Sequence, residues 1–454
     1  MAVRQKQVGR HQRKPAPKPT NPLQAGILDF VKHQARITNA PIGRSNNISD
    51  ISLDTSALPK RFTLYPPLLL LPPNFVAHSA DWARFYASLG DGDKEELFSH
   101  IAGAFKSQRI THIAINAPIA AETTGAPHGA EMQSIRENVM RQPSGLVPVF
   151  GDFDPETSNP DHVADGRHVE DSDNLPRQAD LDAAFWVSVS QHRGIMQCWA
   201  PRHTMFSRGN VSEKARILQV QEAGRKPRPF PGLTERELGQ PITDIDIVDF
   251  YVGIGYFAFS YLARGVRRVW GWDLNAWSIE GLRRGCEMNK WRSEVVRVDD
   301  DGALEGTTCA TLAQHIIETD QQQEPIRCVA FIGDNKWAVK VLAEIHQEFC
   351  KAGGQDKLCV RHANLGLLPT SRGSWEGAVK LMQNRRGGWL HVHENVDVQR
   401  IEDVGDDIVQ QIARLVPADR KGEWLVSRAH VEQVKTFAPG VAHCVFDIEI
   451  APNG

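Results

Sequence analysis

The feature that most constrains the fold is a regular alternation of strand-like and helix-like segments between residues 245 and 396. The strand-like runs are IDIVDF, VRRVWGW, CVAFIG, LCVRHANLGLL and GWLHVHEN. Between them lie the helix-like runs GYFAFSYLARG, SIEGLRRGCEMN, WAVKVLAEIHQEFC and SWEGAVKLMQ. Parallel neighbouring strands need long crossover connections, which are usually helical. The spacing therefore predicts an α/β fold with a doubly wound, Rossmann-like parallel sheet.

A smaller α/β domain is predicted before this region, because helix-like DWARFYASL and GDKEELFSHIAGAF and strand-like ITHIAIN lie within 62–120. At 454 residues the chain is long enough for more than one domain. We expect an N-terminal α/β domain over 21–225 and a Rossmann-like domain over 230–454. The linker RKPRPFPGL separates the two.

Three polar segments have no sustained hydrophobic period and are predicted to be surface insertions. They cover 121–145, 154–180 and 292–325. Their role does not follow from the sequence.

The formal charge is −3, from 52 basic and 55 acidic residues, so the total does not by itself indicate a nucleic-acid partner. The charge is unevenly distributed, however. Residues 1–20 carry six basic residues and no acidic one, which predicts a disordered basic tail; an RNA-binding arm and a targeting segment are the alternatives. Further basic stretches at 202–214, 225–228 and 385–386 predict a basic face.

The seven cysteines form no C-x-x-C pair, which argues against a disulfide framework or a structural zinc site. We therefore expect a reducing compartment, the cytoplasm. The most apolar run, at 68–71, is too short to span a bilayer and is bracketed by prolines, so no membrane association is expected.

A small-ligand site is expected at the carboxyl ends of the parallel strands, where such folds bind their ligands. The first strand of the predicted Rossmann-like domain ends at Asp249, and Gly253 and Gly255 follow. These glycines allow a tight turn and close backbone approach to an anionic group. Asp273 ends the second strand, where a carboxylate can bind ribose hydroxyls. S-adenosylmethionine and dinucleotide folds share this pattern; because Ala258 stands where a dinucleotide motif has its last glycine, an oxidoreductase remains only a minor alternative.

Polar residues also follow the third and fourth of these predicted strands. Asp334 and Asn335 are placed to meet the exocyclic amine of an adenine. Asn364 and Pro369, in HANLGLLP, suit recognition of a flat purine, although the segment could equally be an ordinary loop. His391 and His393 share one face of a buried strand, and without a third ligand we interpret them as core histidines rather than a metal pair. No metal is predicted.

Six motifs, taken in order, closely resemble the tRNA wybutosine-synthesizing protein 2 family, within the superfamily of tRNA guanine-37 N1-methyltransferases. They are APRHTMFSRGNVSEKARIL, DFYVGIGYF, WDLN, FIGDNK, HANLGLLP and GGWLHVHEN. The match covers 181–396, and TLYPPLLLLPPNF resembles the upstream domain of the family.

The resemblance implies an aminocarboxypropyltransferase of wybutosine biosynthesis. Such enzymes take the 3-amino-3-carboxypropyl group from S-adenosylmethionine and leave methylthioadenosine. The acceptor is C7 of 4-demethylwyosine at position 37, in the anticodon stem-loop of phenylalanine tRNA. We expect this chain to act as a monomer.

The resemblance also implies particular site residues. Ser207, Lys214, Asp273, Asp334 and Asn335 correspond to positions that bind S-adenosylmethionine. Family members commonly have Glu in place of Asp273, and either carboxylate can hold a ribose.

Arg202 and Arg208 are predicted to bind the tRNA substrate, with Asn364 and Pro369 beside the target base. Two alternatives remain. The chain could be a guanine-37 N1-methyltransferase, although HANLGLLP is longer than the N-L-P turn of those relatives. It could also be a non-catalytic tRNA-binding protein, which the intact Asp249, Gly253 and Gly255 argue against.

Overall fold

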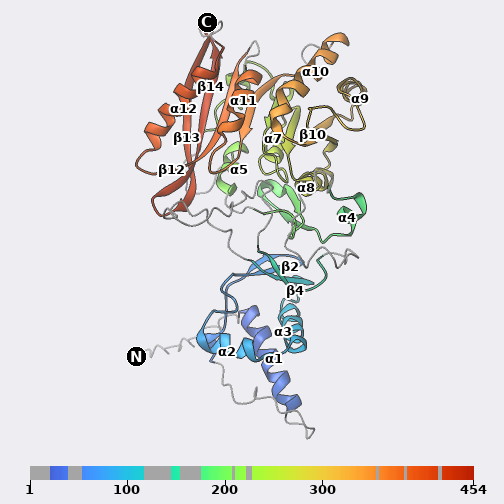
Figure 1. Cartoon of the computed structure of the whole chain (residues 1–454), viewed down its shortest axis with the longest axis vertical. Helices are drawn as coiled ribbons and strands as arrows, with labels where there is room; N and C mark the ends of the chain where they lie inside the picture. The colour runs from blue at the N-terminus through green and yellow to red at the C-terminus, as the bar shows by residue number, and fades with distance from the viewer. Residues whose placement is uncertain are drawn as a thin grey trace, which may run out of the picture. The chain divides into compact units, whose positions relative to one another are not determined.

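The computed structural model describes most of the 454 residues. The described ranges are 21–38, 54–116, 145–153, 175–206, 210–220, 228–353, 357–382, 386–417 and 422–453. The chain divides into two compact units (Figure 1). The first contains Met1–Ala120 and Gly145–Asp152, and the second contains Ala121–Ser144 and Phe153–Gly454.

The first unit is a small α/β domain, as the sequence predicts. Its four-stranded sheet has the order β1-β2-β3-β4, with β2 and β3 parallel and the outer pairs antiparallel. One side of the sheet contributes to a core that also contains the apolar faces of three helices. The elements are α1 (Pro22–Thr38), β1 (Thr63–Tyr65), β2 (Leu68–Leu71), α2 (Ala80–Ser88), α3 (Asp91–Ala104), β3 (His112–Ile115) and β4 (Val147–Phe150).

The boundary between the units differs from the predicted one at residue 225. The segment after Phe153 belongs to the second unit and contains α4 (Gln178–Ala183), the antiparallel pair β5 (Val187–Ser190) and β6 (Met196–Trp199), and α5 (Val211–Ile217). The side-chain amide of Asn289 fixes β6 there, because it accepts from Met196 N–H at 2.9 Å and donates to Met196 C=O at 2.7 Å. The described part of the predicted linker packs against the second unit, since Phe230 is buried in its core.

The second unit is built on an eight-stranded sheet of order β13-β14-β12-β11-β7-β8-β10-β9. Strands β7 to β12 run parallel to one another, and β14 is antiparallel to both β12 and β13. The strands are β7 (Asp246–Asp249), β8 (Arg268–Asp273), β9 (Arg292–Arg297), β10 (Ile326–Ile332), β11 (Val360–Leu365), β12 (Gly388–Asp397), β13 (Trp424–Ala438) and β14 (Val441–Pro452).

Helices cover both faces of this sheet, so the predicted doubly wound α/β fold is confirmed. Along β7, Ile247 packs in a core with residues of α5 to α8, and the next residue, Val248, packs in a separate core with residues of α9 to α12. This alternation is what a sheet buried on both faces requires. The helices are α6 (Glu235–Leu238), α7 (Ala258–Arg264), α8 (Ala276–Met288), α9 (Cys309–Gln321), α10 (Ala338–Lys351), α11 (Trp375–Met382) and α12 (Ile401–Leu415).

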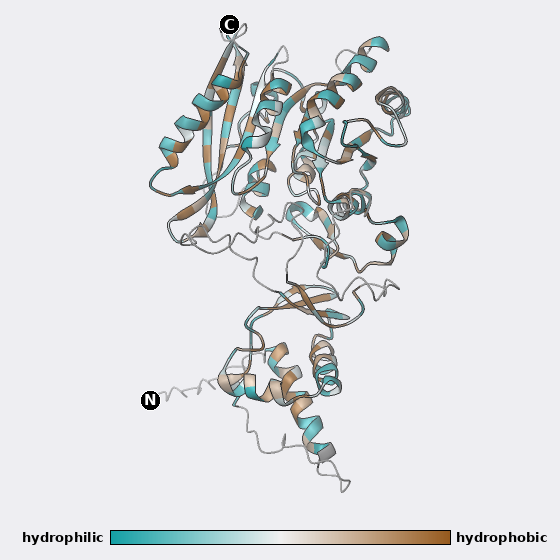
Figure 2. Cartoon of the chain, in the orientation of Figure 1, coloured by the Kyte–Doolittle hydropathy of each residue, from teal (hydrophilic) through white to brown (hydrophobic). Residues whose placement is uncertain are grey.

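Helix α12 shows how these covering helices are held. In Figure 2 it alternates hydrophilic and hydrophobic stretches, and its Ile408 and Ile412 are fully buried in the core. That i, i+4 spacing places both side chains on one helix face, and the charged residues lie on the other.

The prediction that 292–325 is a surface insertion is wrong. The segment contains the edge strand β9 and the helix α9, and β9 pairs with β10 through six residues. Its strand RSEVVR is polar because an edge strand faces water along one side and needs few apolar residues. The other two predicted insertions, 121–145 and 154–180, lie mostly outside the described residues.

Candidate functional site

The candidate site lies at the carboxyl ends of β7, β8, β10 and β11. Strand order reverses between β7 and β11, because β8 follows β7 on one side whereas β11 flanks it on the other. Ligands of open α/β sheets bind at this kind of switch point. The predicted residues of four strand ends are therefore at one edge of one sheet.

A glycine turn connects β7 to α7. Gly253 and Gly255 have φ values of 53° and 83°, a left-handed conformation that favours glycine. A Cβ atom at Gly253 would lie 2.9 Å from the Tyr256 ring, and one at Gly255 would lie 2.6 Å from the Phe259 ring. Both glycines are thus required for the turn itself, and they leave its backbone accessible to a ligand.

Asp273, the last residue of β8, connects that strand end to the glycine turn. Its Oδ2 accepts from Gly253 N–H at 2.9 Å, and its Oδ1 accepts from Asn275 N–H at 2.8 Å. These bonds hold the half-buried carboxylate in one orientation beside the turn. A carboxylate fixed at this position can still accept from ribose hydroxyls, since each oxygen has a second lone pair.

Asp249 and Asn364 form a buried polar pair at the switch point. Asn364 Nδ2 donates to Asp249 Oδ1 at 3.2 Å, and Tyr251 N–H donates to the same oxygen at 3.2 Å. Asp249 Oδ2 is buried and has no hydrogen-bond partner among the described residues. Burial raises the pKa of Asp249 from 3.8 to about 7. An unsatisfied buried oxygen of this kind fits a donor group supplied by a ligand.

Asp334 and Asn335 follow β10. Asp334 caps the short helix Asn335–Trp337 by accepting from Lys336 N–H at 2.9 Å, and its side chain is 47% exposed. Asn335 Nδ2 donates to Phe250 C=O at 2.7 Å, which ties this strand end to the one after β7. Asn335 thus has a structural bond beside its predicted cofactor role, and the half-exposed Asp334 carboxylate also pairs with Lys336 at 3.3 Å.

Lys214 reaches the glycine turn through Gln197. Lys214 is only 3% exposed, and its Nζ donates to Gln197 Oε1 at 2.7 Å, while Gln197 Nε2 donates to Gly255 C=O at 3.3 Å. No carboxylate pairs with the ammonium group among the described residues, and the rings of Tyr256 and Phe206 lie 5.5 and 5.9 Å from Nζ. Burial lowers the pKa of Lys214 from 10.5 to about 8. A buried cation without a counterion fits an anionic ligand.

The remaining predicted residues lie at the periphery. Pro369 is exposed in the loop after β11, and its C=O accepts from Asn395 N–H at 3.1 Å. Arg202 is exposed on the turn after β6. Ser207 and Arg208 lie outside the described residues, so their predicted roles stay predictions.

The core interpretation of His391 is confirmed by a buried polar chain next to the site. His391 donates to or accepts from His362 at 2.9 Å and lies 2.7 Å from Asp447, which also pairs with Arg216 at 2.5 Å. Arg216 is fully buried and holds Glu213 as well. His393 likewise lies 3.0 Å from His443 in the core. The ion pairs of Arg216 and the bond between His391 and Asp447 hold α5 against β12 and β14, whereas His393 Nε2 and His443 Nδ1 have no hydrogen-bond partner among the described residues.

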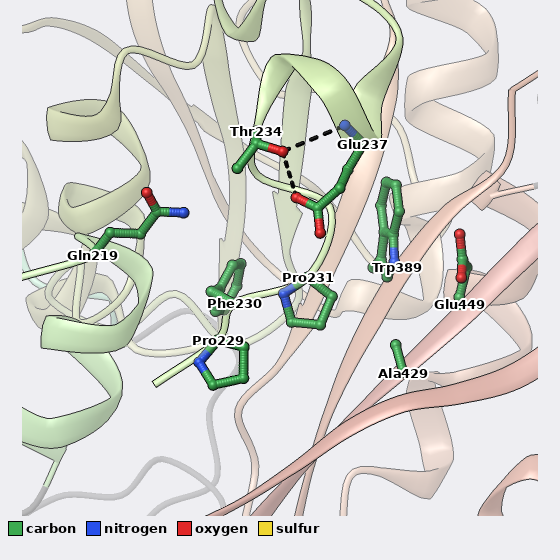
Figure 3. Close-up of a pocket in the computed structure, with 9 residues that line it drawn as sticks. All are labelled: Gln219, Pro229, Phe230, Pro231, Thr234, Glu237, Trp389, Ala429 and Glu449. Carbon is green, nitrogen blue, oxygen red and sulfur yellow. Dashed lines mark hydrogen bonds between the residues drawn. The ribbon is translucent and has the colours of Figure 1, made fainter. Parts of the chain in front are cut away.

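A pocket of the second unit lies away from the strand carboxyl ends. It measures about 550 Å³, and Figure 3 shows the side chains around it. Its lining residues are Gln219, Pro229, Phe230, Pro231, Thr234, Glu237, Trp389, Ala429 and Glu449. Trp389 stands near the amino end of β12, opposite to the edge where Asp249 and Asn364 meet. We therefore assign the candidate site by its polar geometry and not by cavity size.

Sequence reasoning missed Gln197 and Tyr256. Gln197 positions Lys214, and the Tyr256 hydroxyl donates to Met205 C=O, which fixes the segment that leads to Ser207. A polar Gln inside the apolar run GIMQCWAP is the signal that could have indicated the first. No comparable signal marked Tyr256.

The charged and polar groups of the site match those of S-adenosylmethionine. Lys214 can take a carboxylate, the orphaned Asp249 Oδ2 an ammonium group, Asp273 a ribose and Asp334 an adenine amine.

Comparisons with known proteins show the family to which the chain is related. The chain is 33% identical over 400 residues to tRNA wybutosine-synthesizing protein 2 of Schizosaccharomyces pombe, covering 88% of this chain and 74% of that protein. It is 29% identical over 424 residues to the Saccharomyces cerevisiae protein of the same name, covering 87% and 74%. A crystal structure of P. horikoshii TYW2 in complex with MeSAdo matches with a TM-score of 0.44 at 13% identity, covering 93% of this chain and 99% of the other. No family model matches. The chain belongs to the tRNA wybutosine-synthesizing protein 2 family.

Proposed function

We propose that this chain transfers the 3-amino-3-carboxypropyl group of S-adenosylmethionine to C7 of 4-demethylwyosine at position 37 of phenylalanine tRNA. Family membership supports the pathway and the use of S-adenosylmethionine. The single structural observation that carries the proposal is Lys214, a buried ammonium group without a carboxylate partner among the described residues, linked to the glycine turn through Gln197.

The choice of transferred group is a problem of orientation. S-adenosylmethionine supplies a sulfonium with three S–C bonds; attack by C7 on the methionine Cγ breaks the S–Cγ bond, leaves methylthioadenosine and releases the C7 proton to a base. The protein selects Cγ over the methyl carbon by fixing the methionine chain. Alignment of reacting groups can contribute several kcal/mol to such a step.

Lys214 holds one end of that chain in this proposal. Its Nζ binds the methionine carboxylate, and the Gln197 bond at 2.7 Å fixes the direction of the ammonium group. Asp249 Oδ2 accepts from the methionine ammonium. Two opposite charges on two different elements, α5 and β7, then determine the rotation of the chain between them.

Asp273 and Asp334 hold the other end. Asp273 accepts from the ribose hydroxyls, and the exposed Asp334 carboxylate accepts from the adenine amine. Ser207 lies in the motif that resembles the cofactor site of the family and is proposed as a further contact. With both ends bound, the sulfonium has one orientation toward the target base.

tRNA is the substrate class, and phenylalanine tRNA with its modified anticodon stem-loop is the proposed member of it. The exposed Arg202, together with Arg208, is proposed to bind phosphate, and Asn364 and Pro369 flank the target base. The first unit is proposed to contribute tRNA contacts. We further propose that the chain acts as a monomer in the cytoplasm; all seven cysteines are free, which agrees with a reducing compartment. No helix among the described residues is long and apolar enough to cross a membrane.

A double-label transfer assay tests the function. The full chain is incubated with phenylalanine tRNA carrying 4-demethylwyosine and with S-adenosylmethionine labelled either in the methyl carbon or in the carboxypropyl carbons. Only the carboxypropyl label should enter the tRNA, and unmodified tRNA should accept neither. Methyl label in guanine would make the chain a methyltransferase, and no transfer with intact tRNA binding would make it a non-catalytic binding protein.

A further inference from the structure

Four side chains that ligate metals well converge in the first unit, and none of them belongs to the candidate site described above. Asp29 and His33 lie four residues apart on α1, and Glu96 and His100 lie four residues apart on α3. Residues at i and i+4 share one helix face. Each helix therefore presents one carboxylate and one imidazole to the other helix.

The ligand atoms are already close. His33 Nδ1 lies 2.8 Å from Glu96 Oε1, and His100 Nε2 lies 3.9 Å from the same oxygen. One ligand atom from each of His33, Glu96 and His100 falls within 4.8 Å of the other two. In a tetrahedral zinc site, ligand atoms lie about 3.3 Å apart, given bonds of about 2.0–2.1 Å. Small side-chain shifts would bring the three atoms to that spacing.

Asp29 orients one of the imidazoles. Asp29 Oδ2 lies 2.8 Å from His100 Nδ1, a bond that requires the His100 proton on Nδ1. With that proton on Nδ1, His100 Nε2 faces Glu96 Oε1 at 3.9 Å and is the ring nitrogen available to ligate a metal. A carboxylate behind a ligating histidine is the usual outer partner in zinc sites.

The helices are held together at this point by a close backbone contact. A Cβ at Gly26 would lie 2.6 Å from Ile101 Cα, so only glycine permits this approach of α1 to α3. Gly26, Asp29 and His33 follow one stripe of α1, and Ile101 adjoins His100. The α3 side of the cluster is partly sheltered, since the side chains of His100 and Glu96 are 22% and 34% exposed, whereas those of His33 and Asp29 on α1 are 46% and 71% exposed. Gln34 Nε2 donates to Glu96 Oε2 at 2.7 Å and leaves Oε1 to face the histidines.

We propose that the first unit binds one Zn²⁺ ion through His33, Glu96 and His100, with water as the fourth ligand and Asp29 as the outer partner of His100. Two imidazoles and one carboxylate suit zinc, whereas Mg²⁺ and Ca²⁺ prefer oxygen ligands throughout. The ion would link α1 to α3, which come from separate parts of the chain. The sequence predicted no metal because these residues are brought together only by the packing of the two helices.

Metal titration of the full chain, without a histidine tag and after treatment with EDTA, tests the proposal. We expect one Zn²⁺ per chain in calorimetry, and one Co²⁺ per chain with tetrahedral visible bands and no thiolate-to-cobalt charge transfer, since the ligands are nitrogen and oxygen. Single variants H33A and H100A should weaken Zn²⁺ binding at least tenfold, and the double variant should abolish it. Asp29→Asn should weaken it roughly tenfold while one site per chain is retained.

H78A is the matched control, because His78 lies in the same unit but in no metal-ligating group among the described residues. It should bind Zn²⁺ as the wild type does. Unfolding midpoints in EDTA should be similar for all variants, whereas added Zn²⁺ should raise the midpoint only where the cluster is intact. Equal Zn²⁺ binding by the wild type and the double variant, equal loss in H78A, or thiolate bands with Co²⁺ would overturn the proposal.

Discussion

Replacing Lys214 with Met removes the ammonium group proposed to hold the methionine carboxylate. Met is unbranched and apolar, so it can occupy the same buried space without a charge. The substitution should affect the affinities of two ligands differently, although both contain an adenosine moiety. S-adenosylmethionine has the aminocarboxypropyl group, and methylthioadenosine lacks it.

The size of the effect follows from the burial of Lys214. Its pKa is lowered from 10.5 to about 8 by burial, and each pKa unit corresponds to about 1.4 kcal/mol, so the charged form carries a cost of about 3 kcal/mol. A bound carboxylate offsets part of that cost. A hydrogen bond to a charged group contributes about 1.5–3 kcal/mol, so K214M should weaken S-adenosylmethionine binding by roughly 10- to 100-fold.

Calorimetric titration of both ligands measures this difference. K214M should lose affinity for S-adenosylmethionine and keep its affinity for methylthioadenosine. K435M serves as the matched control, because Lys435 is also a partly buried lysine of the second unit, whose pKa is lowered by burial, but lies on β13. It should change neither affinity.

The stability of the same variant provides an independent check. Because the folded-state pKa of Lys214 lies below its unfolded value, wild-type stability should rise as the pH increases from about 8 to 10.5. K214M should lack this rise and should be more stable than the wild type at pH 7 by up to about 3 kcal/mol. Equal loss of both ligands, or unchanged affinity for S-adenosylmethionine, would refute the assigned role.

Three further predictions concern the site and its support. Because the pKa of Asp249 is raised by folding, the free energy of unfolding of the wild type should fall by up to about 4 kcal/mol between pH 4 and 7, and Asp249→Asn should remove this fall. Identical dependence of urea unfolding on pH in the two proteins would contradict this. Asp334→Ala should weaken S-adenosylmethionine binding in calorimetry and leave tRNA affinity in a filter-binding assay nearly unchanged; equal loss of both would exclude its adenine role. Asp447→Ala leaves the fully buried Arg216 without one of its two carboxylates, and leaves His391 without its partner, so the unfolding free energy should fall by about 3–5 kcal/mol; a loss below about 1 kcal/mol in urea denaturation would contradict this.

The local parts of the site could be predicted from the sequence. Gly253 and Gly255 follow a buried strand directly, and Asp273 ends the next one, so strand periodicity alone places all three at one edge of the sheet. The bond from Gly253 N–H to Asp273 then follows from the parallel pairing of β7 with β8.

The long-range parts could not be predicted in this way. The residues next to Lys214 in the sequence predict a lysine on a helix surface, and only the family resemblance assigned it to the cofactor. Its burial depends on the packing of α5 beside β6 and the glycine turn. The domain boundary was misplaced because the prolines near Phe230 suggested a linker, although Phe230 packs onto His391 with ring centroids 4.5 Å apart. Strand β9 was missed because an edge strand needs little apolar character.

The by-product released with each modified tRNA tests the central claim most directly. Transfer of the aminocarboxypropyl group leaves methylthioadenosine, and transfer of the methyl group leaves S-adenosylhomocysteine. With phenylalanine tRNA carrying 4-demethylwyosine, chromatography should find one methylthioadenosine per tRNA modified and no S-adenosylhomocysteine. S-adenosylhomocysteine in proportion to the modified tRNA would contradict the account.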